Sequence, residues 1–241
     1  MRVLSVDLAN TSYANLGIVV LEENQNAFSA RALAARDLDL TGLPSPQHLA
    51  AKLADTYRRL SARVLLLDGP QGWKHPDNGL QHSRVCERVL NTPGKTGLPG
   101  QAKPGNYLPF IAFSIAVFQA LITHGFELWS NRAGPFLAIE SFPLSAWRQL
   151  GLAPLPAKSR VRAAQLQQAT SDLRSLFSVD VPDGLSHDEL QALVAAFAGV
   201  ALARGCRAGY AAAGIAPSLL ENTWREGFII NPTREALRPC A

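Results

Sequence analysis

Three apolar runs in this sequence each end on an acidic residue, and that pattern limits the possible folds more than any other feature. An ionised carboxylate is costly to bury unless it is paired or holds a metal. A strand-end aspartate can also be a simple turn or cap residue, so each acid alone has two readings. The acids are Asp7 after residues 2–6, Asp68 after residues 63–67 and Glu140 after residues 136–139.

The elements around these runs predict an α/β fold with a mixed sheet. A helix is expected over residues 46–61, because Ser45 is a good N-cap and Pro46 is favoured just inside a helix. The run at 63–67 shows no polar alternation, which is typical of a central strand covered on both faces. Before these elements comes a predicted antiparallel three-strand meander at 2–6, 16–21 and 27–35, the last of which could instead be a short helix.

The remainder of the chain predicts helices, strands and one long irregular segment within a single domain, residues 1–241. The irregular insertion, at about 70–106, is rich in glycine and proline, and a connection of this length is usually a functional loop or a disordered one. One helix, at 80–90, is expected within it. The other predicted elements are helices at 109–124, 143–150, 157–177 and 188–204, and a last short strand at 227–230.

A fourth acid stands at the start of the most apolar late helix. Asp188 follows His187 and the N-cap residue Ser186. An acid in the first turn suits the helix dipole, so a capping role alone would explain it. In open α/β sheets, however, ligands bind at the carboxyl ends of the strands. If the acid-bearing strands are neighbours, their carboxylates and that of Asp188 would meet at one edge.

Gathered carboxylates repel one another unless protons or cations neutralise them. Sets of oxygen donors are what Mg²⁺ and Mn²⁺ prefer. Two such ions, about 4 Å apart, can hold the attacking water and the leaving oxygen of a phosphodiester. The pattern therefore predicts a divalent-metal site with Mg²⁺ or Mn²⁺ as the cofactor, held by Asp7, Asp68, Glu140 and Asp188.

The overall charge permits a polyanionic partner without requiring one. The chain has 241 residues and a formal net charge of +4, and its charges are scattered. The longest apolar stretch, 108–121, is too short to span a bilayer and contains Ser114 and Gln119. No basic region followed by an apolar signal core opens the sequence. We therefore expect a cytoplasmic protein that does not enter a membrane.

Four further residues are candidates for substrate binding. Arg84 and Arg88 would form a polar helix face or meet a phosphate, for which a planar guanidinium is suited. Lys95, in the glycine-rich part of the insertion, is either a solvated loop charge or a contact to a nucleic-acid backbone. His187 could hydrogen-bond a carboxylate, carry a proton or simply neighbour the helix cap.

Several motifs resemble a known family when they are read together and in order. They are VDLANTSYANLGIVVL, LLLDGPQGW, SRVCERVLNTPG, IESFPLSAWRQL, HDELQALVAAFAGVALARG and EGFIINP. This set resembles the predicted nuclease family of ribonuclease H-like fold known as domain of unknown function 429. The resemblance implies a ribonuclease H-like mixed sheet, an antiparallel meander followed by parallel strands, flanked by helices. It also implies nucleic acid as the partner, with Asp7, Asp68, Glu140 and Asp188 on the family's acidic positions.

One departure from the family pattern leaves alternatives open. Many relatives carry Asp-x-x-Asp-Ala at the late helix, whereas this chain has Gln191 in place of the second acid. A metal-dependent nuclease is the main hypothesis. The first alternative is a catalytically impaired domain of the same fold that binds nucleic acid or protein. The second is an actin-like nucleotide or phosphate binder, in which Asp7 and the turn at 10–12 would hold a magnesium phosphate.

Overall fold

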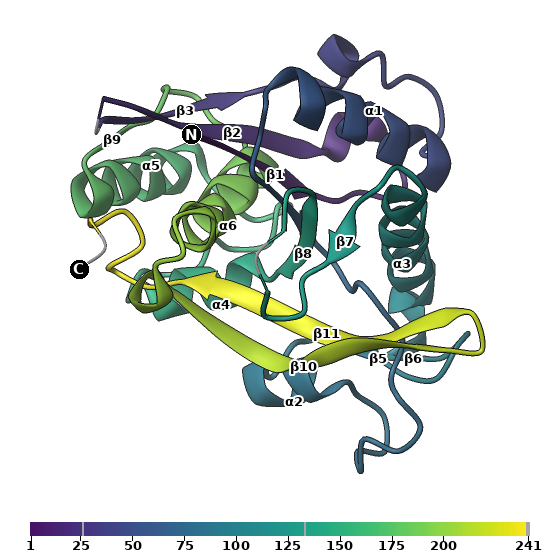
Figure 1. Ribbon diagram of the computed structural model, residues 1–241. Helices are drawn as coiled ribbons and strands as arrows, with labels where there is room; N and C mark the ends of the chain where they lie inside the picture. Colours follow the sequence, from purple (N-terminus) through teal and green to yellow (C-terminus); the bar gives the residue numbers. More distant parts are fainter. Residues whose placement is uncertain (26, 133, 240–241) are drawn as a thin grey trace.

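A nine-stranded mixed sheet forms the centre of the computed structural model, which describes residues 1–25, 27–132 and 134–239 (Figure 1). Its strand order is β10-β11-β8-β4-β1-β2-β3-β9, with β7 beside β8. The strands are β1 Arg2–Asp7, β2 Gly17–Asn24, β3 Ala27–Ala32, β4 Val64–Asp68, β7 Glu127–Leu128, β8 Leu137–Ser141, β9 Val179–Asp180, β10 Tyr210–Leu220 and β11 Thr223–Pro232. A separate two-stranded ribbon is made of β5 Lys95–Thr96 and β6 Ala102–Lys103.

The pairing directions are those expected of a ribonuclease H-like fold. Strand β2 pairs antiparallel with both β1 and β3, which confirms the opening meander. Strand β4 then lies parallel to β1, and β8 lies parallel to β4. The predicted fold class, an antiparallel meander followed by parallel strands with helices on both sides, is therefore confirmed. The carboxyl ends of β1, β4 and β8 consequently meet at one edge of the sheet.

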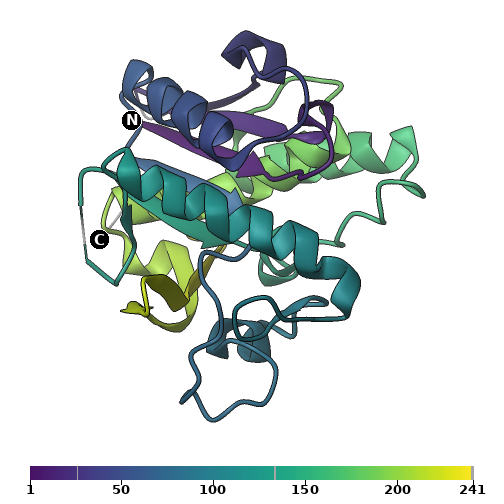
Figure 2. The ribbon, with the colours of Figure 1, turned by 90° about the vertical axis from the view of Figure 1, so that its right-hand side faces the viewer.

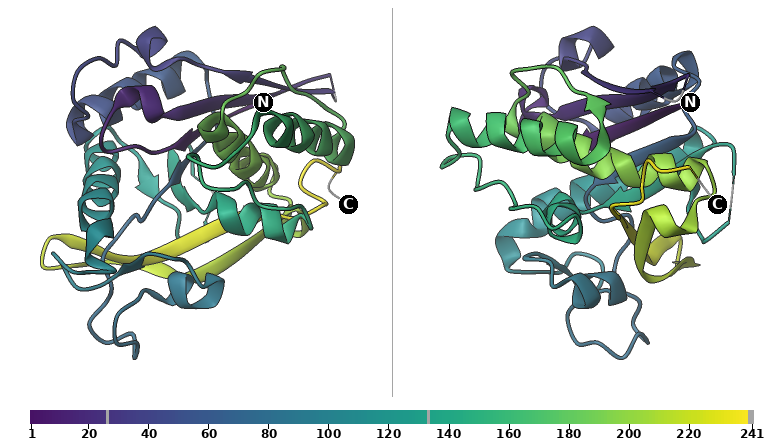
Figure 3. Two further views of the ribbon diagram at one scale, coloured as in Figure 1. Left: turned by 180° about the vertical axis from the view of Figure 1, so that it is seen from behind. Right: turned by 90° about the vertical axis from the view of Figure 1, so that its left-hand side faces the viewer.

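Helices cover both faces of the sheet, as Figures 1 and 2 and the view from behind in Figure 3 show. One face carries α1 and α3, and the other carries α4, α5 and α6. Alternate side chains of the central strands enter the two cores: Val3 and Leu66 face α6, whereas Leu4 and Leu65 face α1 and α3. The helices are α1 Pro46–Arg59, α2 Val85–Leu90, α3 Leu108–Thr123, α4 Pro143–Gln149, α5 Ala163–Phe177 and α6 His187–Ala203.

Side-chain caps fix the starts of α1 and α6. The Ser45 hydroxyl accepts a hydrogen bond from the His48 amide, 3.4 Å away, at the start of α1. Ser186 caps α6 in the same way, and the Glu189 carboxylate accepts a hydrogen bond from the Ser186 amide at 2.7 Å. The reciprocal pair is a capping box, which satisfies amides that the helix leaves unpaired. Both starts agree with the sequence prediction.

The C-terminal part differs from the prediction. The sequence predicts one short strand at 227–230, whereas the structure has a long antiparallel hairpin of β10 and β11. Strand β10 escapes prediction because its sequence, YAAAGIAPSLL, has few β-branched residues and contains a proline. Helix α5 begins at Ala163 rather than at 157, and α2 covers only Val85–Leu90 of the predicted 80–90.

The apolar helix α3 belongs to the core next to α1. By length and composition alone, the segment 105–123 is long and apolar enough to cross a membrane. It extends beyond the apolar stretch 108–121 identified from the sequence. In the structure 44% of this segment is buried, and residues such as Val117, Phe118 and Leu121 are wholly enclosed. The buried side chains of α3 pack against α1 and against the face of the sheet that α1 also covers.

Candidate active site

Asp7 and Asp68 lie side by side at the ends of two neighbouring parallel strands. The register of β1 and β4 pairs Asp7 directly with Asp68. Paired residues in a parallel sheet point to the same face, so both side chains project toward the α6 side. Their carboxyl groups lie within hydrogen-bonding reach of each other. Two carboxylates this close cannot both carry a full charge without a neutralising partner.

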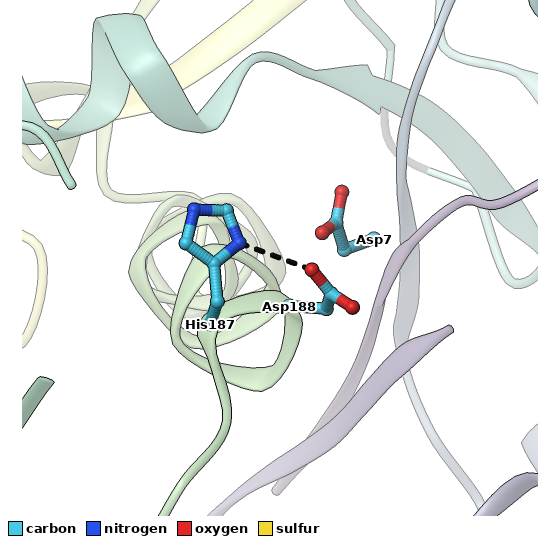
Figure 4. Close-up of side chains that lie close together, drawn as sticks. All are labelled: Asp7, His187 and Asp188. Carbon is cyan, nitrogen blue, oxygen red and sulfur yellow. Dashed lines mark hydrogen bonds and ion pairs between the residues drawn. The ribbon is translucent and has the colours of Figure 1, made fainter. Parts of the chain in front are cut away.

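A glycine in β2 allows α6 to bring Asp188 to the same place. Gly17 pairs with Asp7 across the meander. A β-carbon on Gly17 would lie 2.0 Å from the backbone carbonyl oxygen of Asp188, so only glycine admits this approach. Potential ligand atoms of Asp7, His187 and Asp188 consequently lie within 4.8 Å of one another (Figure 4). The backbone contact thus places the start of α6 against the strand-end acids.

Asp188 already has two cationic or hydrogen-bonding partners. Its Oδ1 lies 3.0 Å from Nδ1 of His187, and its Oδ2 accepts a short hydrogen bond from the Lys158 ammonium. Burial raises the pKa of Asp188, but the hydrogen bonds from His187 and Lys158 outweigh it and leave the pKa below the ordinary value. The carboxylate of Asp188 is therefore held in its ionised form.

The ring of His187 lies between two oxygen acceptors. Its Nε2 is 3.1 Å from the carbonyl oxygen of Pro156, while Nδ1 faces Asp188. A neutral imidazole donates through one nitrogen, whereas the imidazolium donates through both. Each ring nitrogen of His187 therefore has an oxygen within hydrogen-bonding distance.

Asp7 and Asp68 have a different electrostatic environment. Burial raises the pKa of Asp7 well above its ordinary value, and the neighbouring carboxyls of Asp68 and Asp188 raise it further. Burial also raises the pKa of Asp68, to about 7, against the hydrogen bond from Asp7. Lys158 opposes the shift at Asp7, but by less than these causes. Within the described residues, neither acid forms an ion pair.

Glu140 stands apart from this group. The register of β8 pairs it with Leu67, one position before Asp68, and pairs Ser141 with Asp68. Its two oxygens accept hydrogen bonds from the Arg84 guanidinium, both at 2.6 Å, and one also accepts the Gln71 amide at 3.0 Å. The carboxylate of Glu140 is therefore neutralised by an arginine, unlike those of Asp7 and Asp68.

Arg84 occupies a different place from the one its sequence position suggested. It is 1% exposed rather than on a polar helix face, and its Nε also contacts Glu87 at 3.0 Å. The guanidinium is enclosed between two carboxylates, so it does not present a surface to a phosphate. Arg88 is exposed on α2, and Nζ of Lys95 donates to the Glu87 carbonyl at 3.0 Å. Both lie beside α2.

Gln191 uses its carbonyl oxygen within the protein. The oxygen accepts a hydrogen bond of 2.7 Å from the indole Nε1 of Trp147, a residue of α4. This contact ties α4 to α6. The side-chain oxygen of Gln191 is therefore engaged by another residue of the protein.

Lys158 is the site residue that the sequence did not single out. The sequence predicted a helix over 157–177, which would have made Lys158 one of several surface cations. The structure instead has a turn before α5, in which Lys158 reaches Asp188 and also Asn15 at 3.1 Å. Neither partner is near it in sequence, so no local spacing signals the contact.

Comparison with known proteins gives remote structural likenesses. The structure of RuvC from Thermus thermophilus aligns with 15% identity and a TM-score of 0.40, covering 86% of this chain and 95% of that chain. The structure of T. thermophilus RuvC in complex with a Holliday junction substrate aligns with 12% identity and a TM-score of 0.39, covering 86% and 94%. No family profile matches the chain, the family suggested by its motifs included. No curated protein matches it by sequence.

Proposed function

We propose that the protein is a divalent-metal-dependent phosphodiesterase that acts on nucleic acid. The observation that carries the proposal is the difference in charge balance among the four acids. Glu140 is paired with Arg84, and Asp188 with Lys158 and His187, while Asp7 and Asp68 face each other and form no ion pair within the part of the chain that the structure describes. A half-buried carboxylate pair this close calls for a proton or a cation, and a divalent cation can serve both groups at once.

The donor set fits a hard divalent cation. Asp7 and Asp68 offer carboxylate oxygens, which Mg²⁺ and Mn²⁺ prefer. These two residues would hold the ion, with Asp188 beside them. When bound, such an ion lowers the pKa of water and offsets charge on a phosphoryl oxygen. Because Asp188 already binds Lys158, and Gln191 binds Trp147, these residues favour one ion over two.

The remaining residues of the site have roles that follow from their charge. Lys158 is half exposed, so its ammonium can meet a phosphate oxygen at the mouth of the site. His187, whose ring lies between the Asp188 carboxylate and the Pro156 carbonyl, would carry a proton in the same region. Arg88 and Lys95 lie beside α2 and would contact a more distant part of the backbone.

The test is a cleavage assay with single-stranded DNA, duplex DNA and RNA in Mn²⁺, in Mg²⁺ and in EDTA. We expect cleavage of at least one substrate that requires the metal and is lost in Asp7→Asn. The matched control is Asp55→Asn, since Asp55 is exposed on α1 and pairs with Arg58. Cleavage by Asp7→Asn at the wild-type rate would overturn the proposal.

A second candidate function is a binding domain of the same fold that has lost its chemistry. The specific observation in its favour is Lys158, because an ammonium bound to Asp188 can stand where a cation would otherwise be needed. This candidate predicts binding of nucleic acid without cleavage in any metal. It also predicts that Mn²⁺ does not bind detectably to the wild-type protein.

A further inference from the structure

A pocket of about 210 Å³ opens beside Asp68 at the carboxyl edge of the sheet. Its inner end is formed by β8 and the residue that follows it, Ser141 and Phe142. Its walls come from the long insertion and from the start of α3, where Pro93, Tyr107 and Phe110 contribute ring surfaces. The pocket therefore adjoins Asp68, and three aromatic residues, Tyr107, Phe110 and Phe142, contribute to a lining whose accessible surface is mainly apolar.

Two glycines hold the aromatic walls in place. A β-carbon on Gly94 would lie 2.8 Å from the ring of Tyr107, so the bare backbone packs directly against that ring. Gly69 has a φ of +144°, and a β-carbon there would lie 3.2 Å from the ring of Phe110. Both rings are half-buried. The walls are thus preorganised by close packing, which lowers the entropic cost of binding a flat ligand.

One polar group in the lining lacks a partner. Ser141 is 1% exposed, and its hydroxyl makes no hydrogen bond to any part of the chain that the structure describes. A buried hydroxyl without a partner costs free energy. The charged lining residues Arg84, Glu87 and Glu140 are, in contrast, bonded to one another. These ion pairs neutralise the charged part of the lining, so the ring surfaces are what the pocket offers to a ligand.

We propose that this pocket receives one unstacked nucleobase of the nucleic acid whose phosphodiester lies at Asp7 and Asp68. The assignment rests on the proposed function for its substrate class. Flat ring walls suit a base, because every base has a π-face that stacks on aromatic side chains. The volume suits one base and not a base pair. The substrate is therefore a single strand, or a duplex that is locally opened at the site.

The test measures binding separately from cleavage. Wild-type protein in Ca²⁺ is titrated with two fluorescently labelled twelve-nucleotide probes, oligo(dT) and the corresponding abasic sugar–phosphate chain. We expect the abasic probe to bind about 10- to 100-fold more weakly, the loss typical of one stacked base. Equal affinity for the two probes, or no binding of oligo(dT), would overturn the proposal.

Two variants locate the effect at the pocket. Phe110→Ala and Tyr107→Ala should each weaken oligo(dT) binding and leave the affinity for the abasic probe unchanged. Phe136→Ala is the control, because Phe136 is a half-buried ring that packs on Tyr57, away from the pocket. Thermal melts establish that each variant is folded. A loss of affinity that is equal for both probes, or equal in the control, contradicts the pocket assignment.

The outcomes for the pocket and for the nuclease are distinguishable. Base-dependent binding with no cleavage in Mn²⁺ or Mg²⁺ would overturn the nuclease and retain the pocket. Cleavage that proceeds equally on probes with and without bases near the cut would retain the nuclease and overturn the pocket.

Discussion

The α-carbon of Gly17 lies so close to Asp188 that a β-carbon would stand 2.0 Å from the carbonyl oxygen of that residue. Gly17 is the cross-strand partner of Asp7, so the contact fixes the distance between the two acids. A second close approach, at Gly199, seats the middle of α6 on Val3 and Leu66, where a β-carbon would lie 2.7 and 2.8 Å away. Two glycines therefore determine how α6 meets the sheet.

Gly17→Ala should displace the start of α6 and destabilise the protein by about 1–3 kcal/mol, the usual cost of overpacking. It should also weaken Mn²⁺ binding, because Asp188 moves away from Asp7. Gly199→Ala is the control, since it crowds the same helix far from the acids. Urea unfolding and calorimetric Mn²⁺ titration measure the two effects. Equal loss of metal affinity in both variants would contradict the claim that Gly17 positions Asp188 beside Asp7.

Asp68→Asn should change how stability depends on pH in EDTA. The pKa of Asp68 rises from its ordinary value of 3.8 to about 7 in the folded protein. The folded state therefore holds a proton that the unfolded chain has lost, and wild-type stability falls as pH rises between these values. The asparagine cannot titrate, so the variant should gain stability relative to wild type across this window. Parallel unfolding curves at pH 4 and pH 8 would show that Asp68 titrates normally.

Lys158→Gln should tighten the binding of a divalent cation. The ammonium neutralises Asp188, and its removal leaves more negative charge beside Asp7. The same variant should cleave nucleic acid more slowly if Lys158 meets the phosphate. Calorimetry with Mn²⁺ and single-turnover cleavage separate the two effects. Arg160→Gln is the control, because Arg160 is an exposed cation in the same turn. Weaker Mn²⁺ binding by Lys158→Gln than by this control would contradict the prediction.

Arg84→Met should destabilise the fold by about 3–5 kcal/mol, because it leaves two buried carboxylates without their cation. Glu140 and Glu87 are 3% exposed and both bind Arg84. Adding Glu140→Gln to Arg84→Met removes one of the uncompensated charges and should restore part of the loss. Urea unfolding of the single and double variants gives the coupling. A single variant that unfolds like wild type would show that the network adds no stability.

The sequence was sufficient for most of the fold, because its signals there are local. Ser45 and Ser186 mark the helix starts, and the run before Asp68 marks a central strand. The acids Asp7, Asp68 and Asp188 could be expected to meet once the meander and the parallel strands were recognised. The weakly patterned strand β10 could not be identified in this way, because cross-strand pairing with β11 stabilises it rather than its own composition.

The cationic partners of the acidic residues could not be predicted from the sequence. Arg84 and Glu140 are 56 positions apart, and Lys158 and Asp188 are 30 apart, so no spacing rule connects them. The two contacts neutralise Glu140 and Asp188, whereas Asp7 and Asp68 take part in neither. From the sequence, Asp7, Asp68, Glu140 and Asp188 were all predicted to be metal ligands of one carboxylate site. Only the folded arrangement shows that, among the residues described, Asp7 and Asp68 form no ion pair.

A crystal soaked in Mn²⁺, with anomalous scattering recorded at the manganese edge, tests the central claim most directly. If Asp7 and Asp68 hold one divalent ion, we expect one strong anomalous peak in contact with their carboxylates, and no such peak in crystals of Asp7→Asn. A peak elsewhere, or none between these two carboxylates at millimolar Mn²⁺, would contradict this expectation.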